Sequence, residues 1–223
     1  MGAFNLDIYS LIYRLPAIIL ALTIHEFAHG RMAYAFGDPT AKNAGRLSLN
    51  PIVHLDVVGT LALIFFGFGW AKPVPVNPYY FQGNRGQKMM WVAGAGPISN
   101  LAQALLMSVL LSLLWHLAPA TDAPLLWWLY KFLSFLIFIN IVLAVFNLLP
   151  VPPLDGSKIL AGLLPERHMN IIYTLDRYGF FILILLMWLG LTSRIIGPIV
   201  LAIYSGMTRL VGLGDAAYYL LFR

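Results

Sequence analysis

The sequence has no cysteine and few charged residues. None of its 223 residues is Cys, and Asp, Glu, Lys and Arg together make up 10% of the chain. The absence of thiols excludes disulfides and thiolate metal ligands. Charged residues account for about 25% of a typical soluble domain, so the low fraction here argues against an ordinary soluble protein. Hydrophobic residues make up 60%, and this balance predicts an integral membrane protein.

Acidic residues are also scarce relative to basic ones. The chain has 14 Lys and Arg against 9 Asp and Glu, which gives a formal net charge of +5. The basic residues do not gather into a patch on a polar stretch, so we do not expect nucleic acid as a partner. Their positions suit cationic loops beside the anionic surface of a lipid bilayer.

Long apolar segments dominate the rest of the chain. We expect an all-α polytopic membrane protein with about five to six membrane segments, because a spanning helix needs roughly 20 residues. The expected spans are residues 8–36, 89–116, 125–149, 171–192 and 195–213. The apolar stretch 57–70 has only 14 residues and is rich in glycine. We expect it to re-enter the membrane rather than cross it.

Proline alternates with other residues in the run from Lys72 to Pro78. Alternating proline is incompatible with a helix interior or a central strand, so this run predicts an edge strand or a small membrane-associated β-hairpin.

Basic residues in the loops indicate the topology. Loops 37–56, 71–88 and 150–170 carry Lys or Arg, whereas loop 116–124 carries neither. The positive-inside rule therefore places the first three loops on the cytoplasmic side. Loops 37–56 and 71–88 share a side only if the stretch 57–70 turns back.

The first apolar segment contains His25-Glu26-Phe27-Ala28-His29. On a helix the two histidines face the same side, so both imidazoles can bind one metal ion, and Glu26 lies close enough to act on a water molecule there. This H-E-x-x-H pattern is typical of zinc hydrolases. Ionisable groups are costly inside a membrane, which makes a chance motif on a packed helix the weaker interpretation.

Two histidines leave a catalytic zinc ion one protein ligand short. The carboxylates considered for the third position are Asp38, Asp56, Asp122, Asp155, Glu166, Asp176 and Asp215. Asp122 lies on the opposite side by topology, and Asp38 ends the same helix and is expected to point away. Asp155 is favoured because Pro152 and Pro153 stiffen its approach and glycine follows it. A turn residue before glycine is the plainer interpretation of Asp155.

Three motifs together resemble the site-2 protease family of intramembrane zinc proteases, in its compact bacterial and archaeal branch. They are His25-Glu26-x-x-His29, Gly96-x-x-x-Asn100 and Asn147-x-x-Pro150-x-Pro152-Pro153-Leu154-Asp155-Gly156. The run from Lys72 to Pro78 also looks like that branch, and the resemblance extends over residues 11–162. It implies one Zn²⁺ per chain, bound by His25, His29 and Asp155. Larger members add PDZ or CBS domains, for which we expect no room here.

The resemblance implies cleavage of a peptide bond in or near a transmembrane segment of a membrane-protein substrate, with Glu26 as the general base. It also implies that Asn147 contacts the substrate, and Asn140 lies seven residues earlier on the same helix face. We expect Val74 and Val76 to hold an unwound substrate by strand addition. The expected setting is regulated intramembrane proteolysis in the cell membrane, with the active site toward the cytoplasm.

The sequence predicts a single membrane peptidase domain over residues 1–223, with a core at 8–165 and additional spans at 171–213. It leaves a homo-oligomer open. The alternative function is a membrane metal-ion transporter that uses the histidine pair. That alternative requires a continuous polar path, whereas most of residues 101–114 and the last two expected spans have few polar residues.

Overall fold

The computed structural model describes residues 8–66, 69–118, 123–165, 169–214 and 216–222. Its helices are α1 (Ile8–Ala35), α2 (Thr40–Asn43), η1 (Pro51–His54), α3 (Val57–Phe66), η2 (Pro78–Tyr80), α4 (Arg85–Leu117), α5 (Pro124–Asn147), α6 (Asp155–Leu163), α7 (Met169–Trp188), α8 (Leu191–Leu210) and α9 (Ala216–Phe222). The described part of the chain has no β-sheet, which confirms the all-α expectation.

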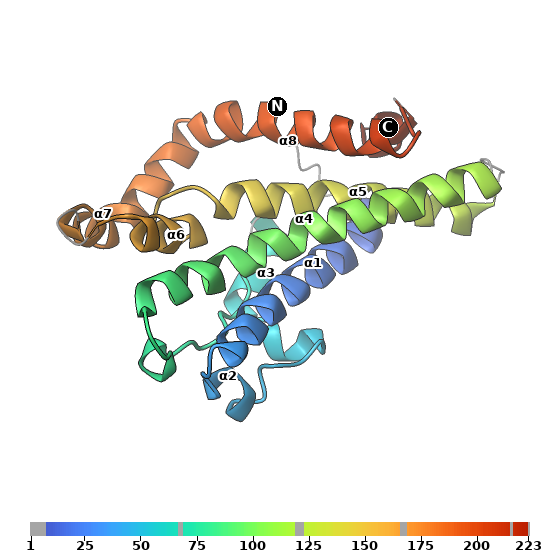
Figure 1. The fold of residues 1–223 in the computed structure, drawn as a ribbon. Coiled ribbons are helices and arrows are strands. Elements are labelled where there is room, and N and C mark those ends of the chain that lie inside the picture. Colours follow the sequence, from blue (N-terminus) through green and yellow to red (C-terminus); the bar gives the residue numbers. More distant parts are fainter. Residues whose placement is uncertain (1–7, 67–68, 119–122, 166–168, 215, 223) are drawn as a thin grey trace.

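Three helices are long and apolar enough to cross a membrane among the described residues. They are α1 from Ser10, α4 and α5, and they pack together as the centre of the fold (Figure 1). At about 1.5 Å per residue, the 33 residues of α4 extend about 50 Å, which exceeds a hydrocarbon core of about 30 Å. The expected spans 171–192 and 195–213 correspond to α7 and α8, and their crossing of the membrane stays a prediction.

Local sequence explains where the central helices begin. Asn84 precedes α4, and its side-chain oxygen accepts a hydrogen bond from the Gln87 N–H at 3.0 Å, which satisfies one of the free donors of the first turn. Pro124 occupies the first turn of α5, where a missing N–H costs nothing.

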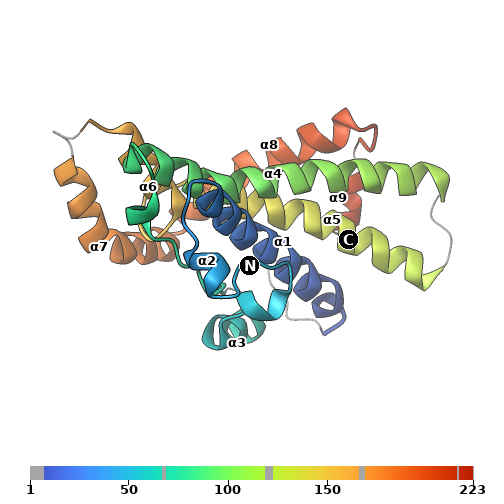
Figure 2. The same cartoon turned by 60° about the horizontal axis from the view of Figure 1, so that its bottom comes forward.

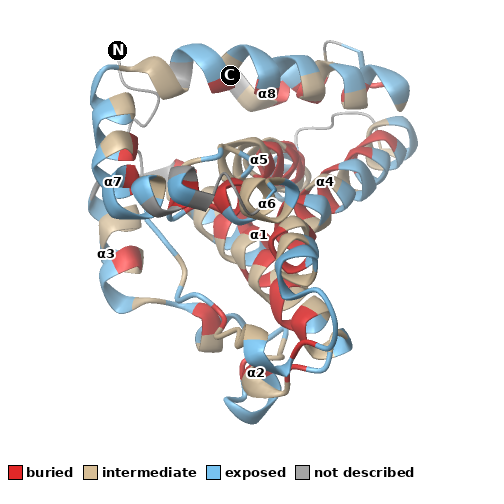
Figure 3. Cartoon of the chain, turned by 60° about the vertical axis from the view of Figure 1, so that its left-hand side comes forward, coloured by how far each residue is buried: buried red, intermediate tan, exposed pale blue. Residues whose placement is uncertain are grey.

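Apolar packing joins these helices into one body. One buried cluster contains residues of α4, α5, α8 and α9, including Leu111, Ile137 and Tyr204. A second cluster joins α1 to α5 through Ala17, Ala21 and Leu136. Figure 3 shows buried positions concentrated where α1, α4, α5 and α6 meet, with large exposed faces on α7 and α8.

The stretch 57–70 leaves the bundle and returns to its starting point. Leu55 and Ala71 form an antiparallel bridge, and the Lys72 N–H donates to the His54 carbonyl at 2.8 Å. Between these points the chain forms α3 (Figure 2), whose Leu63 packs against the cluster that contains Ala17 and Ala21 of α1. Both ends of the stretch therefore lie together, as a re-entrant segment requires.

The expected β-hairpin is not confirmed. Residues Lys72–Asn77 run without regular secondary structure, and the bridge between Leu55 and Ala71 is isolated. Pro73 and Pro75 have no N–H to donate, so a ladder cannot form on the side where these residues would pair.

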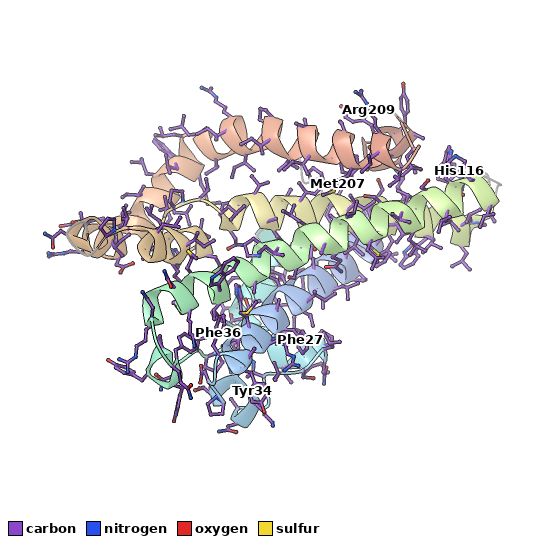
Figure 4. All side chains as sticks on the ribbon, viewed as in Figure 1. Phe27, Tyr34, Phe36, His116, Met207 and Arg209 are labelled. Carbon is purple, nitrogen blue, oxygen red and sulfur yellow. The ribbon has the colours of Figure 1, made fainter. Side chains whose placement is uncertain are left out.

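The bundle has two distinct ends. Tyr34 and Phe36 lie at one end, near the start of α4, whereas His116 lies at the far end of α4, near Met207 and Arg209 of α8 (Figure 4). The first end also holds α2, α6 and the run Lys72–Asn77, and it is the end at which the candidate residues gather.

Candidate metal centre

Three side chains from two distant parts of the chain meet inside the bundle. His25 and His29 lie one turn apart on α1, and Asp155 is the first residue of α6. The two Nε2 atoms are 3.0 Å apart, and each lies 3.2 Å from Oδ2 of Asp155. All three side chains are buried, and together they could hold a metal ion.

The other ring nitrogens settle which atoms face this point. Nδ1 of His29 lies 2.7 Å from the Val92 carbonyl oxygen, which only accepts, so Nδ1 carries the proton. Nδ1 of His25 lies 2.5 Å from Oδ1 of Asn100. The Asn100 amide nitrogen donates to the Ala21 carbonyl at 3.3 Å, which fixes the amide orientation. In the neutral imidazoles both Nε2 atoms therefore present lone pairs to the carboxylate.

This donor set fits a zinc ion. Two imidazole lone pairs and a carboxylate oxygen directed at one point repel each other unless positive charge lies between them. Oδ2 of Asp155 is buried and has no hydrogen-bond donor within the described ranges. In a tetrahedral site with ligands at about 2.0–2.1 Å, neighbouring ligand atoms lie about 3.3–3.4 Å apart. The observed separations are close to those values.

Positive charge also keeps Asp155 ionised. Burial by itself would raise the pKa of this carboxyl, but the imidazoles of His25 and His29, when protonated, hold the pKa well below its usual range. Protons on the imidazoles and a metal ion between the ligands are alternative sources of that charge. Nζ of Lys158 lies 3.9 Å from the other carboxylate oxygen, Oδ1.

Glu26 lies beside this group and contacts the proline-rich run. Its Oε2 accepts a hydrogen bond from the Val74 N–H at 2.8 Å. Val74 itself is buried against α1 at Gly30, where an added Cβ would lie 3.2 Å from a Val74 methyl carbon. The glycine after His29 thus lets the run Lys72–Asn77 lie close to the candidate general base.

A cavity of about 670 Å³ opens onto these side chains. Among the eight residues assigned to the site from the sequence, seven line it: His25, Glu26, His29, Val74, Val76, Asn147 and Asp155. The Asn147 amide nitrogen donates to the Leu143 carbonyl of its own helix at 3.0 Å. Lys158 and Asp176, to which the sequence assigned no role, also line the cavity.

Asn140 lies elsewhere, in a polar network between the three central helices. It is fully buried, its Oδ1 accepts from the Asn100 amide at 2.7 Å, and its own amide donates to the Leu136 carbonyl at 2.8 Å. Asn100, in turn, accepts from His25. This chain of contacts favours support of the His25 imidazole over contact with a substrate. An asparagine inside an apolar span was the available signal for Asn100.

Helix α4 approaches the histidines without a side chain between them. A Cβ added at Gly96 would lie 2.5 Å from Nε2 of His29 and 2.6 Å from Nε2 of His25. Any larger residue would enter the space where the ligand atoms meet. The Gly96-x-x-x-Asn100 motif therefore combines a close approach with a hydrogen-bond acceptor for His25.

A helical membrane bundle with a buried His–His–Asp group and an adjacent glutamate is a membrane-embedded metalloenzyme by fold and site. Residues 121–189 match the model of Peptidase family M50. The chain is 41% identical over 186 residues to the Bacillus subtilis protein named "Putative zinc metalloprotease YwhC". The aligned region covers 83% of this chain and 84% of that protein.

Two further relatives carry the same kind of name. The Methanocaldococcus jannaschii protein named "Putative zinc metalloprotease MJ0611" is 30% identical over 70% of this chain and 73% of its own length. The Mycolicibacterium smegmatis protein named "Putative zinc metalloprotease Rip2" is 30% identical over 76% of this chain and 64% of its own length. No solved structure matches.

The chain therefore belongs to peptidase family M50, the site-2 protease family, as its motifs indicated. It is a membrane-embedded zinc metalloendopeptidase. The family and the names of the relatives do not favour the alternative of a metal-ion transporter.

Proposed function

We propose that this protease hydrolyses a peptide bond in or near a transmembrane segment of a membrane-protein substrate. The observation that carries the proposal is the position of Glu26, which lines one cavity with the His25–His29–Asp155 group and is bonded to the run Lys72–Asn77. A proton acceptor, a metal-binding group and a surface for an extended peptide are the parts that such a reaction requires.

His25, His29 and Asp155 would hold one Zn²⁺. Bound zinc supplies Lewis acidity, which lowers the pKa of water toward about 7 and polarises a carbonyl group. Glu26 takes a proton from the attacking water and returns it to the leaving amine. The Val92 carbonyl and the Asn100 side chain hold the Nδ1–H groups of His29 and His25, which fixes both rings in the tautomer that binds metal through Nε2.

A transmembrane helix hides its peptide bonds, so the substrate must be unwound before attack. We assign this step to the Val74–Val76 edge, which would pair with an extended substrate through its backbone N–H and C=O groups. Glu26 already accepts from the Val74 N–H. A substrate carbonyl that takes this N–H would release Glu26 for the reaction. Asn147, at the end of α5, would donate to the substrate backbone or to the developing oxyanion.

We assign the chain one peptidase domain over residues 1–223, with its core at 8–165. The cavity lies at the end of the bundle that carries Lys72, Lys158 and the basic loop after α1. By the positive-inside rule we place this end, and the active site, at the cytoplasmic face of the cell membrane.

Reconstitution of the purified protein with a single-span substrate tests the proposal. We expect wild-type protein to cut the substrate and Glu26→Gln to lose cleavage by at least a hundredfold while it retains zinc. Asp176→Asn, which removes a carboxylate of the same cavity to which we assign no role, is the matched control. Cleavage by Glu26→Gln at the wild-type rate would refute the assigned base.

A further inference from the structure

Asp38 is a buried carboxylate that the proposed reaction does not use. The sequence placed it at the end of the first span, directed away from the metal. In the structure it is fully buried, and both of its oxygens accept hydrogen bonds. Oδ1 accepts from the Thr40 N–H at 2.9 Å and from the Thr40 hydroxyl. Oδ2 accepts from the Asn77 N–H at 2.7 Å, across 39 positions of sequence.

The Asn77 contact fixes one end of the proline-rich run. The other end is held by Arg46, whose Nη2 donates to the Lys72 carbonyl, and by the Lys72 N–H, which donates to the His54 carbonyl. Arg46 is buried as well. Two buried charged side chains outside the catalytic group therefore hold the two ends of one short segment, whose middle contacts Glu26 at Val74.

The prolines make these braces necessary. A strand in a sheet is held by a ladder of backbone hydrogen bonds, but Pro73 and Pro75 cannot donate to one, and no ladder is formed within the described ranges. In an extended chain, N–H groups alternate in direction. Extended geometry would place the N–H groups of Val74 and Val76 on one side and that of Asn77 on the other. The Val74 N–H donates to Glu26 and the Asn77 N–H to Asp38.

We propose that Asp38 is a positioning residue which, together with Arg46, holds the run Lys72–Asn77 at a fixed distance from Glu26 so that it can align an extended substrate. This inference rests on the proposed function, because it assigns substrate alignment to the Val74–Val76 edge. Neither Asp38 nor Arg46 lines the cavity, and their hydrogen bonds described above are not to the metal ligands.

The first test measures the segment itself and needs no catalysis. Hydrogen exchange followed by mass spectrometry reports on the amides of Lys72, Val74, Val76 and Asn77, the donors that this run possesses. A hydrogen bond to a charged group stabilises the closed state of an amide enough to slow its exchange about ten- to hundredfold. We expect Asp38→Asn to speed exchange in this run by about that factor, because an amide cannot accept with both of its polar atoms.

Thr40→Val is the matched control. It removes the hydroxyl that donates to Asp38 within the same turn, and it leaves the Asn77 contact in place. We expect exchange in the run to match wild type. Arg46→Gln removes the guanidinium that donates to the Lys72 carbonyl at the other end of the run. If Asp38→Asn does not accumulate in the membrane, the exchange rate of the run in Arg46→Gln tests the proposal in its place. Unchanged exchange in both Asp38→Asn and Arg46→Gln would overturn the proposal.

The second test separates alignment from general stability. With the single-span substrate, we expect Asp38→Asn and Arg46→Gln to raise KM about tenfold and to spread cleavage over neighbouring peptide bonds, with zinc content unchanged. A purely structural role would lower the fraction of active enzyme and leave KM and the cut positions as in wild type, and that outcome would overturn the inference. If wild-type protein does not cleave the single-span substrate, or if Glu26→Gln cleaves it at the wild-type rate, the proposed function is refuted instead.

Discussion

Replacing Gly96 by alanine tests the geometry of the metal centre directly. The added methyl carbon would lie 2.5 Å from Cε1 of His25 and from Nε2 of His29, which is about 1 Å inside the normal contact distance for carbon. Either α4 moves away from α1 or the imidazoles turn. Both movements separate the ligand atoms, so we expect a loss of zinc affinity in Gly96→Ala.

The size of the loss follows from the packing. Overpacking a buried position costs about 1–3 kcal/mol. The strain is present when the ligands hold zinc and is relieved when they move apart. Because about 1.4 kcal/mol corresponds to a factor of ten, this strain converts to a loss of about five- to 150-fold in zinc affinity. Displacement of the Asn100 contact, on the same helix, would act in the same direction.

Gly94→Ala provides the control within the same helix. Among the described residues, a Cβ at Gly94 meets Ile98 alone, at 3.8 Å, which is an ordinary contact. Both variants gain the same helix propensity, about 0.8–1.0 kcal/mol, so this term cancels in the comparison. Zinc affinity is measured in detergent by competition with a metal-sensitive chelator. Equal affinities for Gly96→Ala and Gly94→Ala, within a factor of two, would refute the geometry described for the centre.

Three further predictions follow from contacts around the site. Asn100→Leu should weaken zinc binding about ten- to hundredfold, because His25 loses the acceptor of its Nδ1–H. Asn140→Leu should weaken zinc binding less, and the same chelator competition compares the zinc affinities of the two variants. Val74→Ala and Val76→Ala should change which single-span substrates are cut at normal zinc content, and loss of zinc in these variants would contradict the role of the edge. Removal of zinc by chelation should abolish cleavage, and added Zn²⁺ should restore it; cleavage that survives complete removal would exclude the proposed chemistry.

The bounds of the three central helices could be predicted from the sequence. The expected spans 8–36, 89–116 and 125–149 differ by no more than four residues at either end from α1, α4 and α5. Long apolar runs allow few other structures in a membrane, where every backbone group must be hydrogen-bonded within the chain. The return of the stretch 57–70 to its starting point was predictable for a similar reason, because its length does not suffice for a crossing.

The contacts between helices were harder to predict. Asn140 was expected to contact a substrate because it shares a helix face with Asn147, yet its amide faces Asn100 inside the bundle. Helix periodicity tells which residues share a face, but it does not tell which neighbour that face meets. Asp38 was expected to point away from the metal because it ends the helix that carries the histidines. Its hydrogen bond from Asn77 was not expected, since Asn77 lies far along the chain.

The few polar groups inside the bundle explain how an apolar chain can define one geometry. Apolar side chains gain little from one particular rotation of a helix in lipid, because the lipid tails are equally apolar. An unpaired amide is costly there. Asn100 contacts the Ala21 carbonyl and His25 on α1 and Asn140 on α5. A rotation of α4 by one residue would break all three contacts at once, so this single side chain fixes the histidines relative to both neighbouring helices.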